Sequence, residues 1–138
     1  VVLMIIGYRG AEGAFFWGRN PALVGINNLL MLASVYLFAA SGMKTAIARR
    51  MRHPMLTGVL LWAVAHLLVN GDTPSFLLFG GLGVWAVAQM AIINTQAPDW
   101  TPPPARPAKF EAMALGGTVI VFAAIAGVHY ALGYPAFG

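Results

Sequence analysis

The sequence contains no cysteine and very little charge. Only 9% of its 138 residues are charged, whereas 59% are hydrophobic. A soluble domain typically has about a quarter charged residues, so a soluble chain this apolar would lack the polar surface to cover itself. The composition therefore indicates an integral membrane protein. The absence of cysteine excludes disulfides, thiolate metal sites, cysteine nucleophiles and covalently attached c-type haem.

Carboxylates are also scarce, and none falls inside an apolar run. The four of them, Glu12, Asp72, Asp99 and Glu111, lie in expected loops or at the edges of expected helices. This placement argues against a carboxylate-based pathway for protons or cations through the membrane. The sequence also has no glycine-rich phosphate loop after a strand and no serine–histidine–aspartate arrangement.

Four apolar runs meet or approach the roughly 20 residues that a helix needs to cross the hydrocarbon core. They cover residues 22–42, 55–69, 74–93 and 114–133, and residues 1–7 look like the end of a fifth. In lipid these segments should be helices, because isolated strands leave their backbone groups unpaired. The predicted fold is all-α, a polytopic transmembrane bundle of four full spans plus the end of a fifth at the N-terminus.

The eight lysine and arginine residues predict the orientation of this bundle. Six of them fall in two loops, residues 43–54 and 94–112, and two fall on the opposite side, at Arg9 and Arg19. Basic residues favour the cytoplasmic side of a membrane, so both loops are predicted to be cytoplasmic. We accordingly interpret the net charge of +4 as a topology signal and expect no nucleic-acid partner.

The segment "NGDTP" between the second and third runs predicts a tight helical hairpin. Asn70 and Gly71 can end one helix in the left-handed conformation. Asp72 or Thr73 can cap the next helix, with Pro74 at its first position. This structural explanation is favoured over a catalytic role for Asp72.

Polar side chains collect at one expected depth of the bundle. His66 lies four residues before Asn70, about 6 Å below the end of its helix, and His129 lies about 7 Å below its own end. Asn27 and Asn28 lie about 8 Å from the same side of the membrane, and Tyr130 follows His129. His66 also shares a helix face with Gly58, Trp62 and Asn70, which are spaced four residues apart.

Two imidazoles at one depth have two explanations. Without further ligands they cannot complete a zinc site, but two axial histidines suffice for a non-covalent b-type haem. The small residues Gly58, Ala126 and Gly127 would leave space for the macrocycle. The alternative is an interhelical hydrogen bond from His66 to Asn27 or Asn28 that only holds helices together. The residues alone favour this packing role slightly and leave both explanations open.

Three stretches of the chain resemble successive signatures of the NnrU family, which includes the plant and algal 15-cis-zeta-carotene isomerase. They are "GYRGAEGAFFW", "RHPMLTGVLLWAVAHLLVNGDTPSFLLFGG" and "HYALGYPAFG", and the resemblance covers nearly the whole chain. The most specific positions lie in the central block: Arg52-His53-Pro54, Trp62, His66-Leu67-Leu68, Asn70-Gly71-Asp72 and Phe79-Gly80.

The resemblance implies a single transmembrane domain over residues 1–138, lacking the N-terminal span that the family usually has. In the isomerase branch it also implies haem b, and histidine ligation carries over to His66 first and His129 second. Expected to line the same cofactor site are Trp62, Asn70, Asn27 and Asn28.

Three functions are compatible with the resemblance. The first is an accessory role in denitrification, supporting nitrite and nitric oxide reduction, or in a larger complex of the bacterial cytoplasmic membrane. The second is a haem-dependent 15-cis-zeta-carotene isomerase. The third is a non-catalytic structural or pigment-binding subunit. The expected partners are the lipid bilayer, other membrane subunits, and a carotenoid or other apolar ligand.

Overall fold

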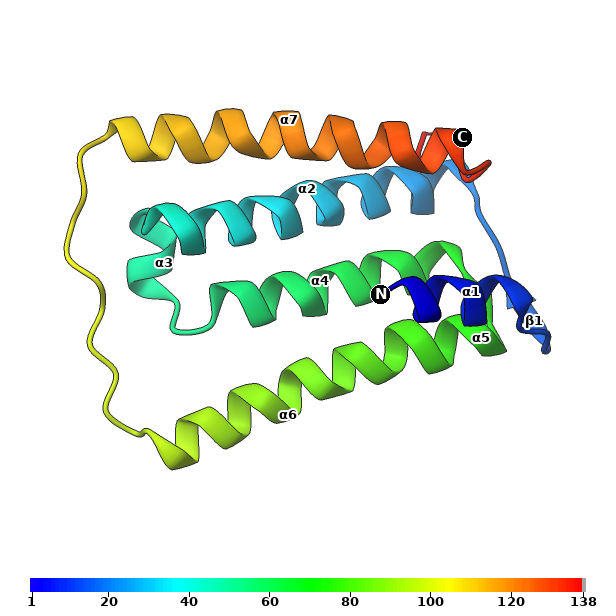
Figure 1. Ribbon diagram of the computed structural model, residues 1–138, viewed down its shortest axis with the longest axis horizontal. Coiled ribbons are helices and arrows are strands. Elements are labelled where there is room, and N and C mark those ends of the chain that lie inside the picture. The colour runs from blue at the N-terminus through cyan, green and yellow to red at the C-terminus, as the bar shows by residue number, and fades with distance from the viewer. Residues whose placement is uncertain (138) are drawn as a thin grey trace.

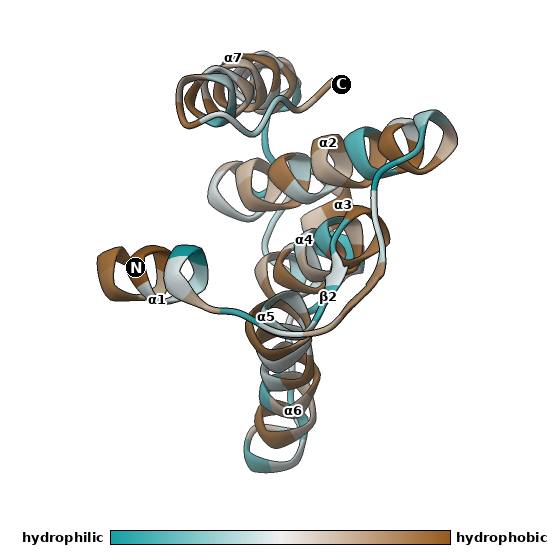
Figure 2. Cartoon of the chain, turned by 90° about the vertical axis from the view of Figure 1, so that its right-hand side faces the viewer, coloured by the Kyte–Doolittle hydropathy of each residue, from teal (hydrophilic) through white to brown (hydrophobic). Residues whose placement is uncertain are grey.

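Four long helices lie side by side in a row in the computed structural model, which describes residues 1–137 (Figures 1 and 2). In spatial order they are α7 (Lys109–Ala131), α2 (Pro21–Met43), α4 (Pro54–Val69) and α6 (Gly81–Gln96). Two short elements, α5 (Thr73–Ser75) and the π-helical turn η1 (Phe76–Gly80), run directly into α6. The remaining elements are α1 (Val2–Gly10), β1 (Phe15–Trp17), α3 (Ala46–Arg50) and β2 (Gly71–Asp72).

Three helices, not four, are long and apolar enough to cross a membrane. They are Pro21–Met43, Lys109–Ala131 and the continuous helix Thr73–Gln96. The second predicted span is the 16-residue α4, which at 1.5 Å per residue is about 24 Å long. Pro54 fixes its start, and pairing of β2 stops it at Val69. The four-full-span prediction is thus not supported, whereas a mainly helical membrane fold is.

The turn after α4 differs from the predicted left-handed helix end. Neither Asn70 nor Gly71 has a positive φ. Instead Gly71 and Asp72 form β2, which pairs antiparallel with β1 in a two-stranded sheet. Gly71 is needed for close approach, because a Cβ at this position would overlap the Trp17 indole.

The capping prediction for the same turn is confirmed. Asp72 Oδ1 accepts a hydrogen bond from the Ser75 backbone N–H at 2.8 Å, which satisfies one of the free donors at a helix start. Pro74 occupies the second helical position rather than the first.

The contact between α2 and α4 depends on Gly58. Its ideal Cβ would lie 3.0 Å from a Phe38 ring carbon and 3.2 Å from the Ser34 carbonyl oxygen. The Ser34 hydroxyl donates to the Gly58 carbonyl oxygen at 2.7 Å. Gly58 therefore brings two helices together, which corrects the prediction that it leaves space for a macrocycle.

Both basic connections lie at one end of the row, opposite the β1–β2 sheet (Figure 1). Side chains join them there to the ends of the helices. Glu111 Oε1 accepts from the Ala46 backbone N–H at 2.6 Å, and Arg106 donates to the Met43 carbonyl oxygen at 3.2 Å. Arg52 donates to the carbonyl oxygen of Ala97.

The outer surfaces of the long helices carry large apolar side chains. Leu29 is 69% exposed, Leu77 75% and Ile120 70%, and Figure 2 shows hydrophobic positions along the outside of these helices. Such continuous apolar exposure fits a lipid environment, where it costs nothing.

Candidate functional site

A cavity of about 710 Å³ opens among α1, α2, α4, η1 and α7. Its volume lies within the roughly 300–1,000 Å³ of typical ligand sites. All six side chains that the sequence proposed for a cofactor site line it: Asn27, Asn28, Trp62, His66, Asn70 and His129. The structure therefore brings together residues from three separate helices.

His66 lies in the last turn of α4 and is held on several sides. Its Nδ1 lies 2.9 Å from the Trp62 carbonyl oxygen one turn earlier. Its ring stacks on Phe79 with centroids 4.6 Å apart and an interplanar angle of 20°, and the Trp62 ring lies 5.1 Å away. The Asn70 side chain donates to the His66 carbonyl oxygen at 2.9 Å. These contacts fix both the ring and the backbone of His66.

His129 faces His66 from the last turns of α7. Its Nδ1 lies 2.8 Å from the Ile125 carbonyl oxygen. The centroids of the two imidazoles are 6.3 Å apart. Two imidazoles that bind one metal ion from opposite sides have centroids about 6 Å apart, because each metal–nitrogen bond is about 2 Å. The observed separation thus matches a shared metal ion.

The hydrogen bonds also assign the tautomers of both histidines. A backbone carbonyl only accepts, so each Nδ1 must carry the proton and each Nε2 must have a free lone pair. Neither Nε2 has a hydrogen-bond partner among residues 1–137. Metal-binding histidines in proteins commonly use this arrangement, with the second ring nitrogen donating to a carbonyl.

The chemistry of the donor set selects the kind of metal group. Within residues 1–137, no cluster of three or more histidine, cysteine, aspartate or glutamate side chains could hold a bare ion. Haem needs only two protein ligands, because the porphyrin supplies four nitrogens. Apolar side chains line much of the cavity and suit a flat macrocycle, among them Met31, Phe79, Leu82, Phe122 and Ala126. The residues present therefore fit a b-type haem.

The two asparagines do not contact His66. Asn27 Nδ2 lies 3.5 Å from Asn28 Oδ1, and Asn28 Nδ2 donates to the Ala136 carbonyl oxygen at 3.1 Å. The predicted packing bond from His66 to Asn27 or Asn28 is therefore wrong. Each histidine is satisfied by its own helix, which leaves the asparagines to the cavity wall and the segment after α7. Asn27 Oδ1 is buried without a partner in the described chain.

Two other expectations fail because of helix rotation. Gly127 has open space around its Cα and does not line the cavity, whereas its neighbour Ala126 does. Tyr130 is 49% exposed and lies outside the cavity lining. Residues next to each other on a helix point about 100° apart, so depth alone does not place a side chain in the cavity.

Several lining residues were not identified from the sequence. Phe79 stacks on His66, and the Tyr8 ring packs edge-on against Phe79 at 5.8 Å. The Tyr8 hydroxyl also lies 2.9 Å from Ser75 Oγ. The predicted hairpin at residues 70–74 could have placed Phe79 opposite His66. Nothing local in the sequence signals that Tyr8, Arg9, Arg19 and Tyr134 reach the same cavity.

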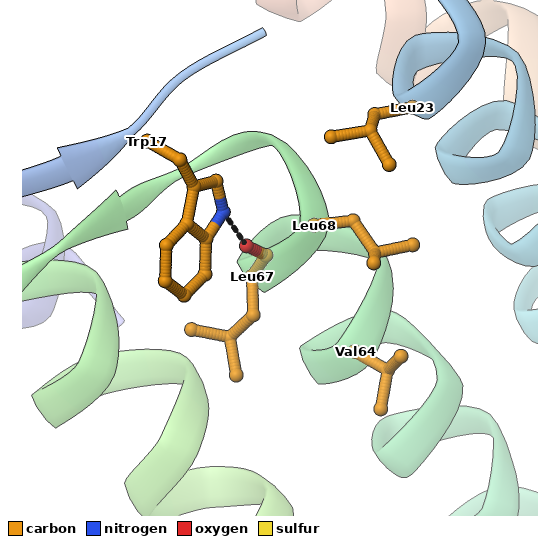
Figure 3. A pocket seen from close by; sticks show the side chains of 5 residues that line it. All are labelled: Trp17, Leu23, Val64, Leu67 and Leu68. Atoms are coloured by element: carbon orange, nitrogen blue, oxygen red, sulfur yellow. Dashed lines mark hydrogen bonds between the residues drawn. The ribbon is translucent and has the colours of Figure 1, made fainter.

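A second pocket lies between β1, α2 and α4 (Figure 3). It is smaller, about 380 Å³, and is lined by Trp17, Leu23, Val64, Leu67 and Leu68. Its one polar contact is the bond from Trp17 Nε1 to the Leu67 carbonyl oxygen at 2.9 Å. This pocket offers no titratable or metal-binding group, so the chemistry of the described chain concentrates in the two-histidine cavity.

Fold and site together define a helical membrane protein with a paired-imidazole cavity. The chain belongs to the NnrU family, whose profile, described as "NnrU protein", matches residues 1–136. The family resemblance of the sequence is thus confirmed over essentially the whole chain. No curated protein and no solved structure matches it.

Proposed function

We propose that this protein binds b-type haem, with His66 and His129 as axial ligands. The observation that carries the proposal is the pair of unpartnered Nε2 atoms on rings 6.3 Å apart, each fixed by a carbonyl of its own helix. Phe79 and Trp62 would orient the His66 side of the site. When bound, haem would supply one-electron redox chemistry that the side chains of this chain cannot supply themselves.

The same observation favours an accessory role over catalysis. Two fixed histidines would fill both axial positions and leave none for a substrate. The described cavity lining also contains no carboxylate that could act as a general acid or base. We therefore propose that the protein carries haem in a membrane assembly that supports nitrite and nitric oxide reduction, as its family resemblance implies.

An absorption spectrum of the purified protein tests this proposal. Protein purified in detergent from haem-replete cells should show the Soret and visible bands of a six-coordinate, low-spin b-type haem after reduction. The double variant His66→Ala/His129→Ala should lose these bands while keeping its helical circular dichroism. A well-folded wild-type preparation without colour would refute haem binding and leave a structural subunit as the remaining function.

One observation keeps carotenoid isomerisation as a second candidate. His129 lacks the aromatic stacking and the asparagine tie of His66, and α7 ends two residues later, shortly before Gly133 with φ of +82°. A ligand held this loosely can leave and open one axial position. Binding of carbon monoxide by the reduced wild type, together with conversion of 15-cis-zeta-carotene in a carotenoid-producing host, would support this candidate. Carbon monoxide binding without conversion would favour the nitrogen-oxide role.

A further inference from the structure

The mouth of the two-histidine cavity carries two positive charges. Among residues 1–137, the lysine, arginine, aspartate and glutamate side chains that line the cavity are Arg9 and Arg19 alone. Arg9 lies in the last turn of α1, and Arg19 directly precedes Asn20, the N-cap of α2. Two separate segments of the chain thus bring a guanidinium to one opening, above walls that are mostly apolar.

Neither guanidinium is neutralised by the described chain. No carboxylate within residues 1–137 forms an ion pair with Arg9 or Arg19. The Arg9 guanidinium lies 5.7 Å from the centroid of the Tyr134 ring, which positions the group without compensating its charge. Asp72, at the same end, already accepts the Ser75 backbone N–H. The mouth therefore has an unmatched charge of +2.

We propose that Arg9 and Arg19 bind the two carboxylates of the tetrapyrrole, which orients its acidic edge toward the mouth and its apolar edge into the cavity. This inference rests on the proposed function. Guanidinium groups pair with carboxylates through two parallel hydrogen bonds. A carboxylate among the apolar walls would lose its hydration without compensation, so only one orientation of an amphipathic macrocycle is favourable. The ligand class that fits is a flat, apolar dicarboxylate.

A titration with metal-free protoporphyrin and its dimethyl ester tests the arginines without involving the histidines. Neither probe has an iron, and the two differ only in whether the carboxylates are masked. Apoprotein in detergent should bind the diacid more tightly than the diester. Arg9→Gln and Arg19→Gln should each raise the Kd for the diacid by about tenfold, the effect of losing one charge-assisted hydrogen bond. Neither variant should change the Kd for the diester.

Arg50→Gln is the matched control, because Arg50 is an exposed arginine at the opposite end of the row. It should change neither Kd. Equal losses for diacid and diester would overturn the inference, because the arginines would then act only through the shape of the cavity. Unchanged binding of both probes would also overturn it and assign the arginines to lipid headgroups.

A parallel titration with haem separates this inference from the proposed function. If the diacid binds with the expected arginine dependence but haem shows no Soret change on His66→Ala, axial ligation is wrong and carboxylate binding by Arg9 and Arg19 stands. If haem ligation depends on His66 but the diacid and diester behave alike, the reverse holds. A wild type that binds neither porphyrin nor haem refutes both.

Discussion

The two ends of the helix row use the same residue types in opposite ways, and α4 has a histidine at each end. At the start of α4, His53 Nε2 lies 2.8 Å from Asn94 Oδ1 on α6. At its other end, His66 Nε2 has no partner in the described chain. The arginines follow the same division. Arg52 and Arg106 bond to backbone carbonyls, whereas Arg9 and Arg19 face a cavity without a counter-charge.

This difference shows which polar groups serve the fold and which are available for a ligand. Polar groups in a folded protein normally find partners, so a cluster of groups without them requires another explanation. One end is closed by contacts that join α2, α3, α6, α7 and the linker of residues 97–108. The other end concentrates unpartnered imidazoles, guanidiniums and the Asn27 carbonyl oxygen around one cavity. The contrast, more than any single residue, identifies the functional end.

The largest expected difference between the ends is their exposure to the two sides of the membrane. The native chain has no cysteine, so single cysteines can be labelled without background. In intact cells, an impermeant thiol reagent should label Glu12→Cys and should not reach Arg50→Cys until the cells are permeabilised. Both positions are exposed. The reverse pattern would invert the predicted orientation while leaving the contrast between the ends intact.

The next largest effect should come from the two histidines of α4. His66→Ala should abolish stoichiometric haem binding, because it removes the more firmly held ligand. His53→Ala should leave the Soret band unchanged and lower the free energy of unfolding by about 1 kcal/mol, the contribution of one hydrogen bond. Haem content per protein and thermal unfolding in detergent measure the two effects. Equal loss of haem in both variants would break the comparison.

A smaller effect is expected within the functional end itself. His129→Ala should retain haem with a Kd raised by roughly tenfold to a hundredfold, because His66 and the cavity walls remain. The reduced variant should be five-coordinate and should bind carbon monoxide faster than wild type. Stopped-flow mixing with carbon monoxide measures this change. Complete loss of haem would mean that His129 is held as firmly as His66.

The smallest effect should come from the closed end. Glu111→Gln weakens the bond to the Ala46 backbone N–H at the start of α3. It should reduce the free energy of unfolding by about 1 kcal/mol, with no change in the haem spectrum. Denaturation in detergent followed by circular dichroism measures the loss. A spectral shift in this variant would show that the two ends are coupled.

Local sequence features were sufficient for much of the fold. The apolar runs located the helices to within a few residues, as for 22–42 against Pro21–Met43, although 114–133 missed the first turn of Lys109–Ala131. The Asp72 cap followed from its position before Thr73 and Pro74. The length of α4 was misjudged, because pairing between β1 and β2 ends the chain's helical path and involves residues more than 50 positions apart.

For the candidate site, the sequence by itself determined the depth of each polar residue, since depth follows from distance along a helix. It therefore grouped His66, His129, Asn27, Asn28, Trp62 and Asn70 correctly around one cavity. Only the tertiary structure decided the rotation of each helix, which excludes Gly58 and Gly127, and the partners of each side chain, which exclude the histidine–asparagine bond. It alone brought α1 and the loop after it to the mouth, placing Arg9 and Arg19 beside the histidines. Rotation and long-range packing depend on the contacts of a whole helix surface, and no local pattern encodes them.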